Sequence, residues 1–347
     1  MREELNSLKI YHSPALDVLN LGNNENFYSD WNTSLITEIT EMIKKCSFLN
    51  YGPAIHQGLV NRYSQYINVS SDKIMLGPGS ESLIPLLFNA LTENSTSGKI
   101  LSPDPDFFRY KEIALVLNRQ MLHVPFNEED NIIEQLIEKA NREQVEMIIL
   151  SNPNNPLGRI YSREDLIRLL ENTHCYVVVD EAYAEFCGES LADLIEQGKY
   201  PQLVILRTLS KAFGIANLRI GFALAAEKII QFLIAVQGPF VVSEINANIA
   251  GMVLEHTSKV EEQVRLICEE RDSFIQYLTS FPHIKVYESH ANFVYFIHPE
   301  NKHIRQKLLK YKIAVSFFEP DAIRLTIGTR EQMKYVKLTL GKILSEL

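Results

Sequence analysis

The chain has 347 residues, of which 46% are hydrophobic and 22% are charged, so it has the composition of a soluble globular protein, and its length predicts two domains. Its formal net charge of −9 provides no basic surface, and we expect no nucleic-acid partner. No apolar run reaches the roughly 18 residues that a membrane span needs, and the first residues lack an apolar signal core. We therefore expect no membrane partner and a cytoplasmic location.

Cysteine and histidine are dispersed along the chain. Cys46, Cys175, Cys187 and Cys268 form no CxxC pair, which indicates a reducing compartment and no structural zinc. The nine histidines form no cluster with the spacing of metal ligands, so we expect no metal site.

Short β-rich apolar runs alternate with helical patterns through the first two thirds of the chain. Strands are expected at residues 73–76, 99–101, 147–150, 176–179, 203–206 and 220–224. Helices are expected between them, among others at residues 80–91, 131–141 and 162–171. The last begins with Ser162 and has Asp165 three residues later, as in an N-cap. Near-continuous apolar strands separated by helices predict an α/β domain with a mainly parallel sheet flanked by helices.

The pattern changes near residue 243. A long helical stretch is expected at 243–278, followed by strands at 292–296 and 322–327 and a closing helix at 331–344. These elements predict a smaller α+β domain over residues 243–347. Residues 1–35 are expected to pack against it, which leaves 36–242 as the large domain. In open α/β sheets ligands bind beyond the carboxyl ends of the strands, so the residues directly after each strand are the candidate site.

Two glycine- and proline-rich turns follow expected strands. Residues 76–82 read LGPGSES, a glycine turn before a helix whose free N–H groups suit a phosphate. Such turns are common before capped helices, so this motif alone is weak evidence. Residues 151–158 read SNPNNPLG, which fixes a rigid turn with amide groups toward the cleft. Taken alone, a turn without any further role is the simpler interpretation.

Two charged residues also follow expected strands. Asp180 comes where a buried strand ends, and an unpaired carboxylate is costly there. A protonated pyridine nitrogen would offset that cost, as would an ion pair with an arginine or a role as a helix cap. Lys211 follows a strand and two hydroxyl residues, and Arg219 comes eight residues later. An isolated lysine is usually a solvated surface charge, but burial would lower the pKa of this amine and make it a usable nucleophile.

Together these stretches resemble the fold-type I aminotransferases, most closely the histidinol-phosphate aminotransferase branch. The resemblance runs from about residue 24 to residue 330, and its most specific part is 208–221. It implies the fold-type I architecture, a large domain with a mainly parallel sheet and a smaller α+β domain. It also implies pyridoxal 5'-phosphate as cofactor, an amino donor and a keto acceptor as substrates, and a homodimer.

The resemblance implies roles for the matching residues. Lys211 would hold the cofactor as a Schiff base and move a proton between the substrate and cofactor carbons, and Asp180 would keep the ring nitrogen protonated. Asn155 and Tyr183 would contact the phenolic oxygen, and Phe107 would stack on the ring. The phosphate would be held by Ser80, Glu81, Thr208, Ser210, Arg219 and, from the neighbouring subunit, Tyr51.

On the substrate side, Arg324 would grip an acidic group, and Asn26 belongs to the Asn-Glu-Asn segment that closes over the site. Taken singly, a surface arginine, a polar turn, a loop tyrosine and a core aromatic are the simpler interpretations of Arg324, Asn26, Tyr51 and Phe107.

Two positions depart from the family pattern. Leu157 stands where the family usually has threonine, and Ser316 stands where histidinol-phosphate enzymes usually have a phosphate-binding arginine. One missing clamp costs on the order of 2–4 kcal/mol of binding. Histidinol phosphate, an aromatic or other amino acid, and a specialised biosynthetic intermediate therefore remain open as substrates.

Two other functions also remain open. A decarboxylase of the threonine-phosphate type has a very similar sequence, and no residue list decides which substrate bond lies perpendicular to the ring. A non-catalytic ligand-binding relic is the alternative from another class. The joint presence of Lys211, Asp180, Asn155 and Arg219 argues against it, because a relic has no reason to keep all four.

Overall fold

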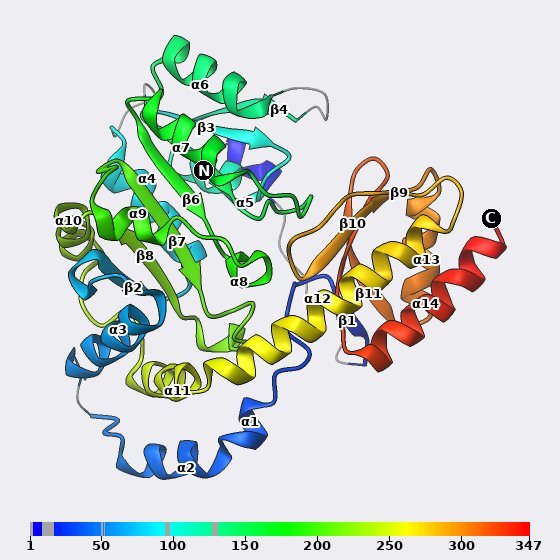
Figure 1. Ribbon diagram of the computed structural model, residues 1–347, viewed down its shortest axis with the longest axis horizontal. Coiled ribbons are helices and arrows are strands. Elements are labelled where there is room, and N and C mark those ends of the chain that lie inside the picture. The colour runs from blue at the N-terminus through cyan, green and yellow to red at the C-terminus, as the bar shows by residue number, and fades with distance from the viewer. Residues whose placement is uncertain (1–2, 9–16, 50, 52, 94–97, 127–130) are drawn as a thin grey trace.

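The computed structural model describes residues 3–8, 17–49, 51, 53–93, 98–126 and 131–347. They form two sheets that lie apart from one another (Figure 1). The larger, seven-stranded sheet has the order β2-β8-β7-β6-β5-β3-β4. Its strands are β2 (Ile74–Gly77), β3 (Lys99–Asp104), β4 (Gln120–Pro125), β5 (Met147–Ser151), β6 (Tyr176–Asp180), β7 (Leu203–Thr208) and β8 (Gly221–Ala225).

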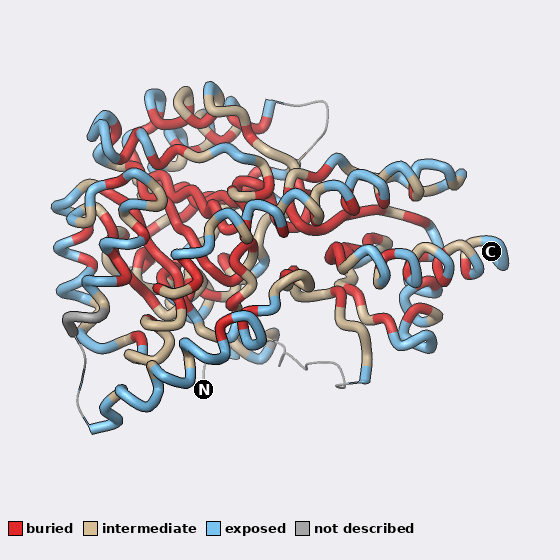
Figure 2. Tube along the Cα trace, turned by 60° about the horizontal axis from the view of Figure 1, so that its bottom comes forward, coloured by how far each residue is buried: buried red, intermediate tan, exposed pale blue. Residues whose placement is uncertain are grey.

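The larger sheet is mainly parallel. Neighbouring strands from β4 to β7 run parallel, and only β8 is antiparallel to its neighbours β2 and β7. Alternate residues of a strand point to opposite faces, and both faces are covered; for example, Val178 packs in one core cluster and Val177 in the other. Buried residues are accordingly concentrated in these strands (Figure 2). The predicted α/β class is confirmed.

Helices cover both faces of the larger sheet (Figure 1). The helices of this part of the chain are α3 (Pro53–Ile67), α4 (Ser80–Leu91), α5 (Arg109–Val116), α6 (Ile132–Glu143), α7 (Arg163–Glu171), α8 (Ala184–Cys187), α9 (Ala192–Gln197) and α10 (Glu227–Gln237). Short 3-10 turns form at η1 (Glu3–Ser7), η2 (Ser71–Lys73) and η3 (Ala216–Leu218). Helix α7 starts as predicted, because the Ser162 hydroxyl accepts a hydrogen bond of 3.1 Å from the Asp165 N–H.

The smaller, five-stranded sheet has the order β1-β11-β12-β10-β9. Its strands are β1 (Leu19–Leu21), β9 (Lys285–Val286), β10 (Phe293–Ile297), β11 (Ile313–Phe318) and β12 (Ala322–Thr326). Helices α12 (Thr257–Thr279), α13 (Asn301–Lys310) and α14 (Arg330–Ser345) accompany it. Strand β1 pairs in parallel with β11, with Leu19 opposite Ile313, so part of the N-terminal segment completes this sheet. Helices α1 (Trp31–Ser34) and α2 (Ile36–Lys45) then lead to α3.

The long helical stretch predicted at 243–278 is interrupted by one turn. The segment forms α11 (Glu244–Leu254) and α12, separated at His256, whose φ of −117° and ψ of 41° are not helical. The break lets α11 pack on α3, whereas α12 runs on to the smaller sheet (Figure 1). The apolar pattern continues through both helices, so it did not indicate the turn.

Four strands were not predicted. Strand β4 lies at an edge of its sheet, β1 and β9 have only three and two residues, and β11 alternates between buried and half-buried positions. The six predicted strands of the larger sheet are present, with ends within three residues of the prediction.

Candidate active site

The amine of Lys211 lies beyond the carboxyl end of β7. Its Nζ donates a hydrogen bond of 2.9 Å to the carbonyl oxygen of Asn23 and lies 5.8 Å from the ring centroid of Tyr183. Burial and, to a smaller extent, the positive charge of Arg324 together lower the pKa of Lys211 to about 8. No carboxylate of the described residues forms an ion pair with this amine. Its neutral, nucleophilic form is therefore available close to neutral pH.

Asp180 ends strand β6 and is buried. Its Oδ2 accepts a hydrogen bond of 2.9 Å from the Tyr110 hydroxyl, and its Oδ1 accepts one of 3.2 Å from the Ala182 N–H. Burial raises the pKa of Asp180 to about 6, while these hydrogen bonds and the charge of Lys211 act in the opposite direction. Within the described ranges no arginine or lysine forms an ion pair with it. Asp180 is thus a buried carboxylate with room for a cationic partner.

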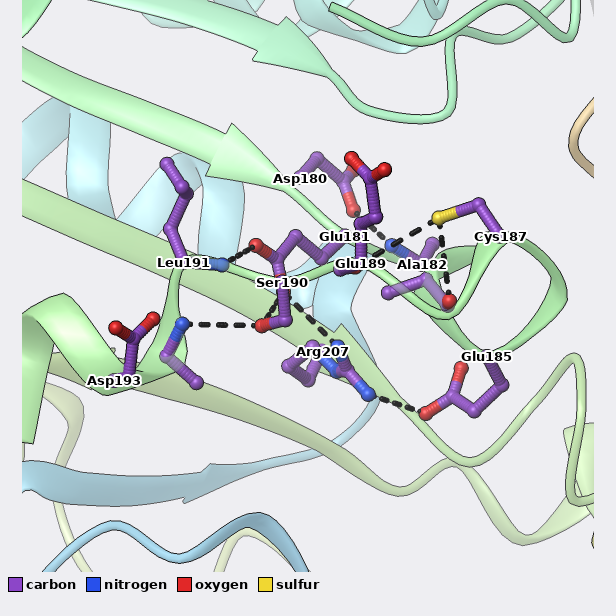
Figure 3. Close-up of polar contacts among 12 residues, drawn as sticks. Asp180, Glu181, Ala182, Glu185, Cys187, Glu189, Ser190, Leu191, Asp193 and Arg207 are labelled. Carbon is purple, nitrogen blue, oxygen red and sulfur yellow. Dashed lines mark hydrogen bonds and ion pairs between the residues drawn. The ribbon is translucent and has the colours of Figure 1, made fainter. Parts of the chain in front are cut away.

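Glu181, the next residue, belongs to a separate buried ion cluster (Figure 3). Its carboxylate accepts hydrogen bonds from Arg207 Nη1 at 2.9 Å, from the Ser190 hydroxyl at 2.5 Å and from the Leu191 N–H at 2.8 Å. Arg207 Nη2 also contacts Glu185 Oε1 at 2.5 Å. This cluster ties β7 to the turn after β6, which directly follows Asp180 and carries Tyr183.

Asn155, Tyr183 and Arg324 form one hydrogen-bonded group across the cleft. The Tyr183 hydroxyl accepts a bond of 2.8 Å from Asn24 Nδ2 and lies 3.5 Å from Asn155 Nδ2. Arg324 Nη1 donates to Asn155 Oδ1, and Arg324 Nη2 donates to the carbonyl oxygen of Gly22 at 2.7 Å. The group joins the turn after β5, the turn after β6, strand β12 and the N-terminal segment.

Arg324 is a buried cation that lacks a carboxylate partner among the described residues. Its side chain lies close to the rings of Phe293 and Phe318, and Nη2 also donates to the Ser316 hydroxyl at 3.2 Å. Its Nε is buried with no acceptor in the described part of the chain. Burial lowers the pKa of Arg324 from its ordinary value. A buried guanidinium in this state favours an anion bound from outside.

The predicted phosphate residues other than Tyr51 belong to the start of α4 and to the segment from the end of β7 to the start of β8. Gly221 pairs with both Gly77 and Thr208, so the ends of β2 and β7 lie on either side of it. No side chain caps α4, and a β carbon on Gly79 would lie only 2.5 Å from Arg219 Nη2. The hydroxyls of Thr208 and Ser210 are hydrogen-bonded to each other at 2.9 Å.

These features fit a phosphate group. Uncapped N–H groups, hydroxyl donors and an arginine without an ion pair in the described ranges all favour a dianion. Ser80 is the first residue of α4, and the Glu81 side chain is engaged with Arg109 Nε at 2.8 Å, so Glu81 offers its backbone.

Phe107 and Asn26 have definite places in the structure. Phe107 is half-buried and makes edge-to-face contacts with Phe108 and Tyr110, both with centroids 5.4 Å apart. Asn26 is buried, and its Nδ2 donates to the Ala212 carbonyl at 2.8 Å and to Gln263 Oε1 at 3.0 Å. The amide protons of Asn26 are therefore engaged within the protein.

Tyr51 is placed apart from the other predicted site residues. It is 75% exposed and stacks on Phe240 with centroids 4.3 Å apart. Its described contacts include none of the residues around Lys211. At the other departure from the family pattern, Leu157 is buried against Tyr295 and Ala322, and its N–H donates to Asn154 Oδ1 at 3.0 Å. The turn after β5 is thus held without a threonine hydroxyl at Leu157.

Comparison with known proteins decides the family. The family model described as aminotransferase class I and II matches residues 16–337. The chain belongs to this family. A histidinol-phosphate aminotransferase of Clostridium kluyveri is 33% identical over 349 residues, which cover 99% of this chain and 98% of that protein. The predicted family and the aminotransferase assignment are confirmed.

Solved structures of related aminotransferases and of a decarboxylase share the fold. A histidinol-phosphate aminotransferase from Sinorhizobium meliloti, in complex with pyridoxal-5'-phosphate, has a TM-score of 0.88 at 19% identity and covers 100% of this chain and 98% of its own. The L-threonine-O-3-phosphate decarboxylase from Porphyromonas gingivalis has a TM-score of 0.80 at 21% identity, with 94% and 100% covered. At such identities the likeness shows the fold alone.

Several contacts in this aminotransferase were not predicted from its sequence. They involve Asn24, Asp106, Tyr110 and Ser151. Asn24 lies in the Asn-Glu-Asn segment, but no local pattern distinguishes it from Asn26. Tyr110 comes three residues after Phe107, and only the structure brings its hydroxyl to Asp180. The described residues contain no group of three histidine, cysteine or acidic side chains that could hold a metal, and none of their helices is long and apolar enough to cross a membrane.

Proposed function

We propose that this aminotransferase moves amino groups from an amino acid or an amino-phosphate to a keto acid, with Lys211 as its catalytic residue. The observation that carries the proposal is the half-buried Lys211 amine, whose pKa is lowered to about 8 and which lies within electrostatic reach of Asp180 and Arg324. Its cofactor is pyridoxal 5'-phosphate. When bound, this group supplies an aldehyde that combines with amines and a ring that accepts electrons from the substrate carbon.

Each part of the site has a role in this proposal. The neutral Lys211 amine acts first as a nucleophile and then carries a proton to and from the substrate carbon. Asp180, with a pKa of about 6, is mostly ionised at neutral pH and holds a protonated ring nitrogen. Asn155 and Tyr183 would contact the phenolic oxygen, and Phe107 would stack on the ring. The backbone of Ser80 and Glu81 would hold the phosphate together with Thr208, Ser210 and Arg219.

Arg324 binds the acidic group of the substrate in this proposal. A planar guanidinium suits both a carboxylate and a phosphate. Similarity to histidinol-phosphate aminotransferases supports a histidinol-phosphate-like substrate. Ser316 lies directly opposite Arg324 on the neighbouring strand and provides a hydroxyl where a second cation would strengthen phosphate binding. The proposed substrate class therefore includes amino acids whose single carboxylate is bound by Arg324. Asn26 contributes indirectly, by holding the N-terminal segment over the site.

The proposal includes a homodimer in the cytoplasm. Phe48, Leu49 and Tyr51 are 82%, 89% and 75% exposed, which is unusual for apolar side chains so close in sequence. A second copy that covers them would bring Tyr51 to the neighbouring phosphate site. We also propose that the large domain spans residues 36–242 and that, of the predicted N-terminal segment 1–35, the part around β1 belongs with the small domain at 243–347, whereas η1 contacts α5 of the large domain.

The test has two stages. Purified protein reconstituted with pyridoxal 5'-phosphate should show an absorbance band that borohydride removes, and peptide mapping should then locate the reduced cofactor on Lys211. Absence of a reducible bond at Lys211 would remove the basis of the proposal. In the second stage, amino donors are screened against several keto acids. A keto product that forms only with an acceptor supports amino transfer, whereas carbon dioxide released without an acceptor would identify a decarboxylase.

A further inference from the structure

The loops that follow β3 and β5 are joined by one carboxylate. These strands are parallel neighbours, with Ile100 opposite Met147, so their carboxyl ends lie side by side. Asp106 Oδ2 accepts a hydrogen bond of 3.1 Å from the Ser151 N–H, and Asp106 Oδ1 accepts one from the Ser151 hydroxyl. A further contact of 3.3 Å, from Asn154 Nδ2 to the Pro105 carbonyl oxygen, joins the same two loops.

The contact continues from Ser151 to the substrate side of the cleft. The Ser151 hydroxyl oxygen accepts a bond of 2.9 Å from the N–H of Asn155. The side chain of Asn155 then accepts from Arg324 Nη1 and approaches the Tyr183 hydroxyl at 3.5 Å. Asp106 is thus connected through Ser151 and Asn155 to the buried guanidinium of Arg324, the proposed binding group for the substrate anion.

Asp106 also fixes the backbone at Phe107, which carries one of the aromatic rings of the site. Its Oδ1 accepts a bond of 2.7 Å from the N–H of Phe107, which fixes the turn that carries the Phe107 ring. The carbonyl of Phe107 accepts a bond of 3.0 Å from the N–H of Tyr110, whose hydroxyl reaches Asp180 at 2.9 Å. One carboxylate therefore lies at the junction of two paths, one to Asn155 and Arg324 and the other to Phe107 and Asp180.

We propose that Asp106 is a positioning residue of this enzyme. It fixes the positions of Asn155 and Phe107 relative to each other for the bound cofactor, and through Asn155 it aligns Arg324. The proposal rests on the proposed function. Asp106 itself touches neither substrate nor cofactor in this account. It acts because a half-buried carboxylate with three donors fixes the positions of both loops more tightly than either turn could alone.

The experiment uses Asp106→Ala, with Asp104→Ala as the matched control. Asp104 is the same residue type two positions earlier, but it is exposed, and its side chain forms no hydrogen bond or ion pair with the described residues. In the protein without cofactor, hydrogen exchange at the amides of Ser151 and Asn155 should speed up about tenfold in Asp106→Ala and stay unchanged in Asp104→Ala. In the holoenzyme, the pKa read from the cofactor absorbance should rise by about one unit. The pKa rises because a displaced Asn155 donates a weaker hydrogen bond to the phenolic oxygen. The negative charge of that oxygen then holds the proton of the neighbouring Schiff-base nitrogen more tightly.

The kinetic readout separates positioning from simple stabilisation. Misalignment of Arg324 should raise KM for the amino donor about tenfold in Asp106→Ala, whereas a purely structural role would lower the melting temperature and leave KM and the spectroscopic pKa unchanged. Ser151→Ala removes only the hydroxyl that passes the contact to Asn155, and it should change the same two quantities in the same direction. If Asp106→Ala does not fold, the Ser151→Ala variant alone tests the positioning role.

Wild-type values of both KM and the spectroscopic pKa in the folded variants would overturn the proposal, whatever happens to their stability. Failure of the proposed function would be seen earlier, as a wild-type protein without a borohydride-reducible bond at Lys211. The inference would then fall with it, before any variant is compared.

Discussion

The guanidinium group of Arg219 lies directly against Gly79, so that a β carbon on Gly79 would come within 2.5 Å of Arg219 Nη2. Gly79 is also the residue before α4 and has a φ of +87° and a ψ of 151°, a backbone conformation that is nearly restricted to glycine. Glycine therefore allows the arginine and the uncapped N–H groups of α4 to approach the same point, where the proposed phosphate binds.

Gly79→Ala should weaken cofactor binding at least tenfold, because the added methyl group displaces Arg219 from the start of α4. The matched control is Gly238→Ala. Gly238 has a similar backbone conformation, with φ +78° and ψ 169°, but a β carbon there would meet nothing within 4 Å. Titration of the apoprotein with pyridoxal 5'-phosphate, followed by absorbance, measures the affinity. Equal affinity losses in both variants would mean that backbone strain, and not the Arg219 contact, is responsible.

Lys211→Met should stabilise the apoprotein at pH 7. The buried ammonium has a folded-state pKa of about 8, below its ordinary value of 10.5, so the folded protein binds its proton less tightly than the unfolded chain. The stability that belongs to this shift is therefore present above about pH 10.5 and is lost as the pH falls through about 8. At pH 7 the charged amine opposes folding by up to about 3 kcal/mol, which methionine removes.

The measurement is the free energy of unfolding by urea as a function of pH. The advantage of Lys211→Met over the wild type should shrink between pH 8 and pH 10.5. Lys228→Met changes an exposed lysine and is the control, with a smaller effect expected. A stability difference at Lys211 that does not vary over this pH range would show that the amine is not as buried as the structure places it.

Local patterns predicted the elements that carry the site, and topology decided the rest. The helix predicted at 80–91 has the observed bounds of α4, since its glycine turn and apolar face are both local signals. The side chains after β6 and β7 lie close together, with Lys211 Nζ 5.8 Å from the Tyr183 ring centroid, because parallel strands end at the same edge of a sheet. The bond between Asn24 and Tyr183 could not be predicted, since 159 positions separate them and only the pairing of β1 with β11 brings them together.

The site contacts that were not predicted from the sequence have the same physical origin. A carboxylate in the loop after β3 is an ordinary turn residue by its sequence, and Asp106 gains its contacts only because β5 is the neighbour of β3. The buried partners of Arg207 were likewise not predicted, because Glu181 and Glu185 could equally have faced solvent. Hydrogen-bond partners across strands depend on strand order, which a single sequence does not specify.

Arg207→Met should lower the free energy of unfolding by about 3–5 kcal/mol, because it leaves the carboxylates of Glu181 and Glu185 buried without a cation. The control is Arg163→Met. Arg163 pairs with Asp193 at 2.6 Å, but their side chains are 37% and 51% exposed, so we expect a loss below about 1 kcal/mol. Urea denaturation at pH 7 measures both. Similar losses in the two variants would argue that the buried cluster contributes no more than a surface pair.

Arg324→Ala should raise KM for the amino donor by about 30- to 1,000-fold, which corresponds to about 2–4 kcal/mol for a lost charge-assisted contact. The absorbance of the bound cofactor should change little, since Lys211, Asp180 and the start of α4 remain in place. Ser316→Ala is the matched control: it removes one bond of 3.2 Å to Arg324 and keeps the guanidinium, so its KM should rise less than tenfold. Steady-state kinetics with several donors separates the two. Arg324 is buried and has no carboxylate partner in the described part of the chain, so a substrate anion is the partner that we expect for it. An unchanged KM in Arg324→Ala would show that Arg324 does not bind the acidic group of the substrate and that other residues recognise it.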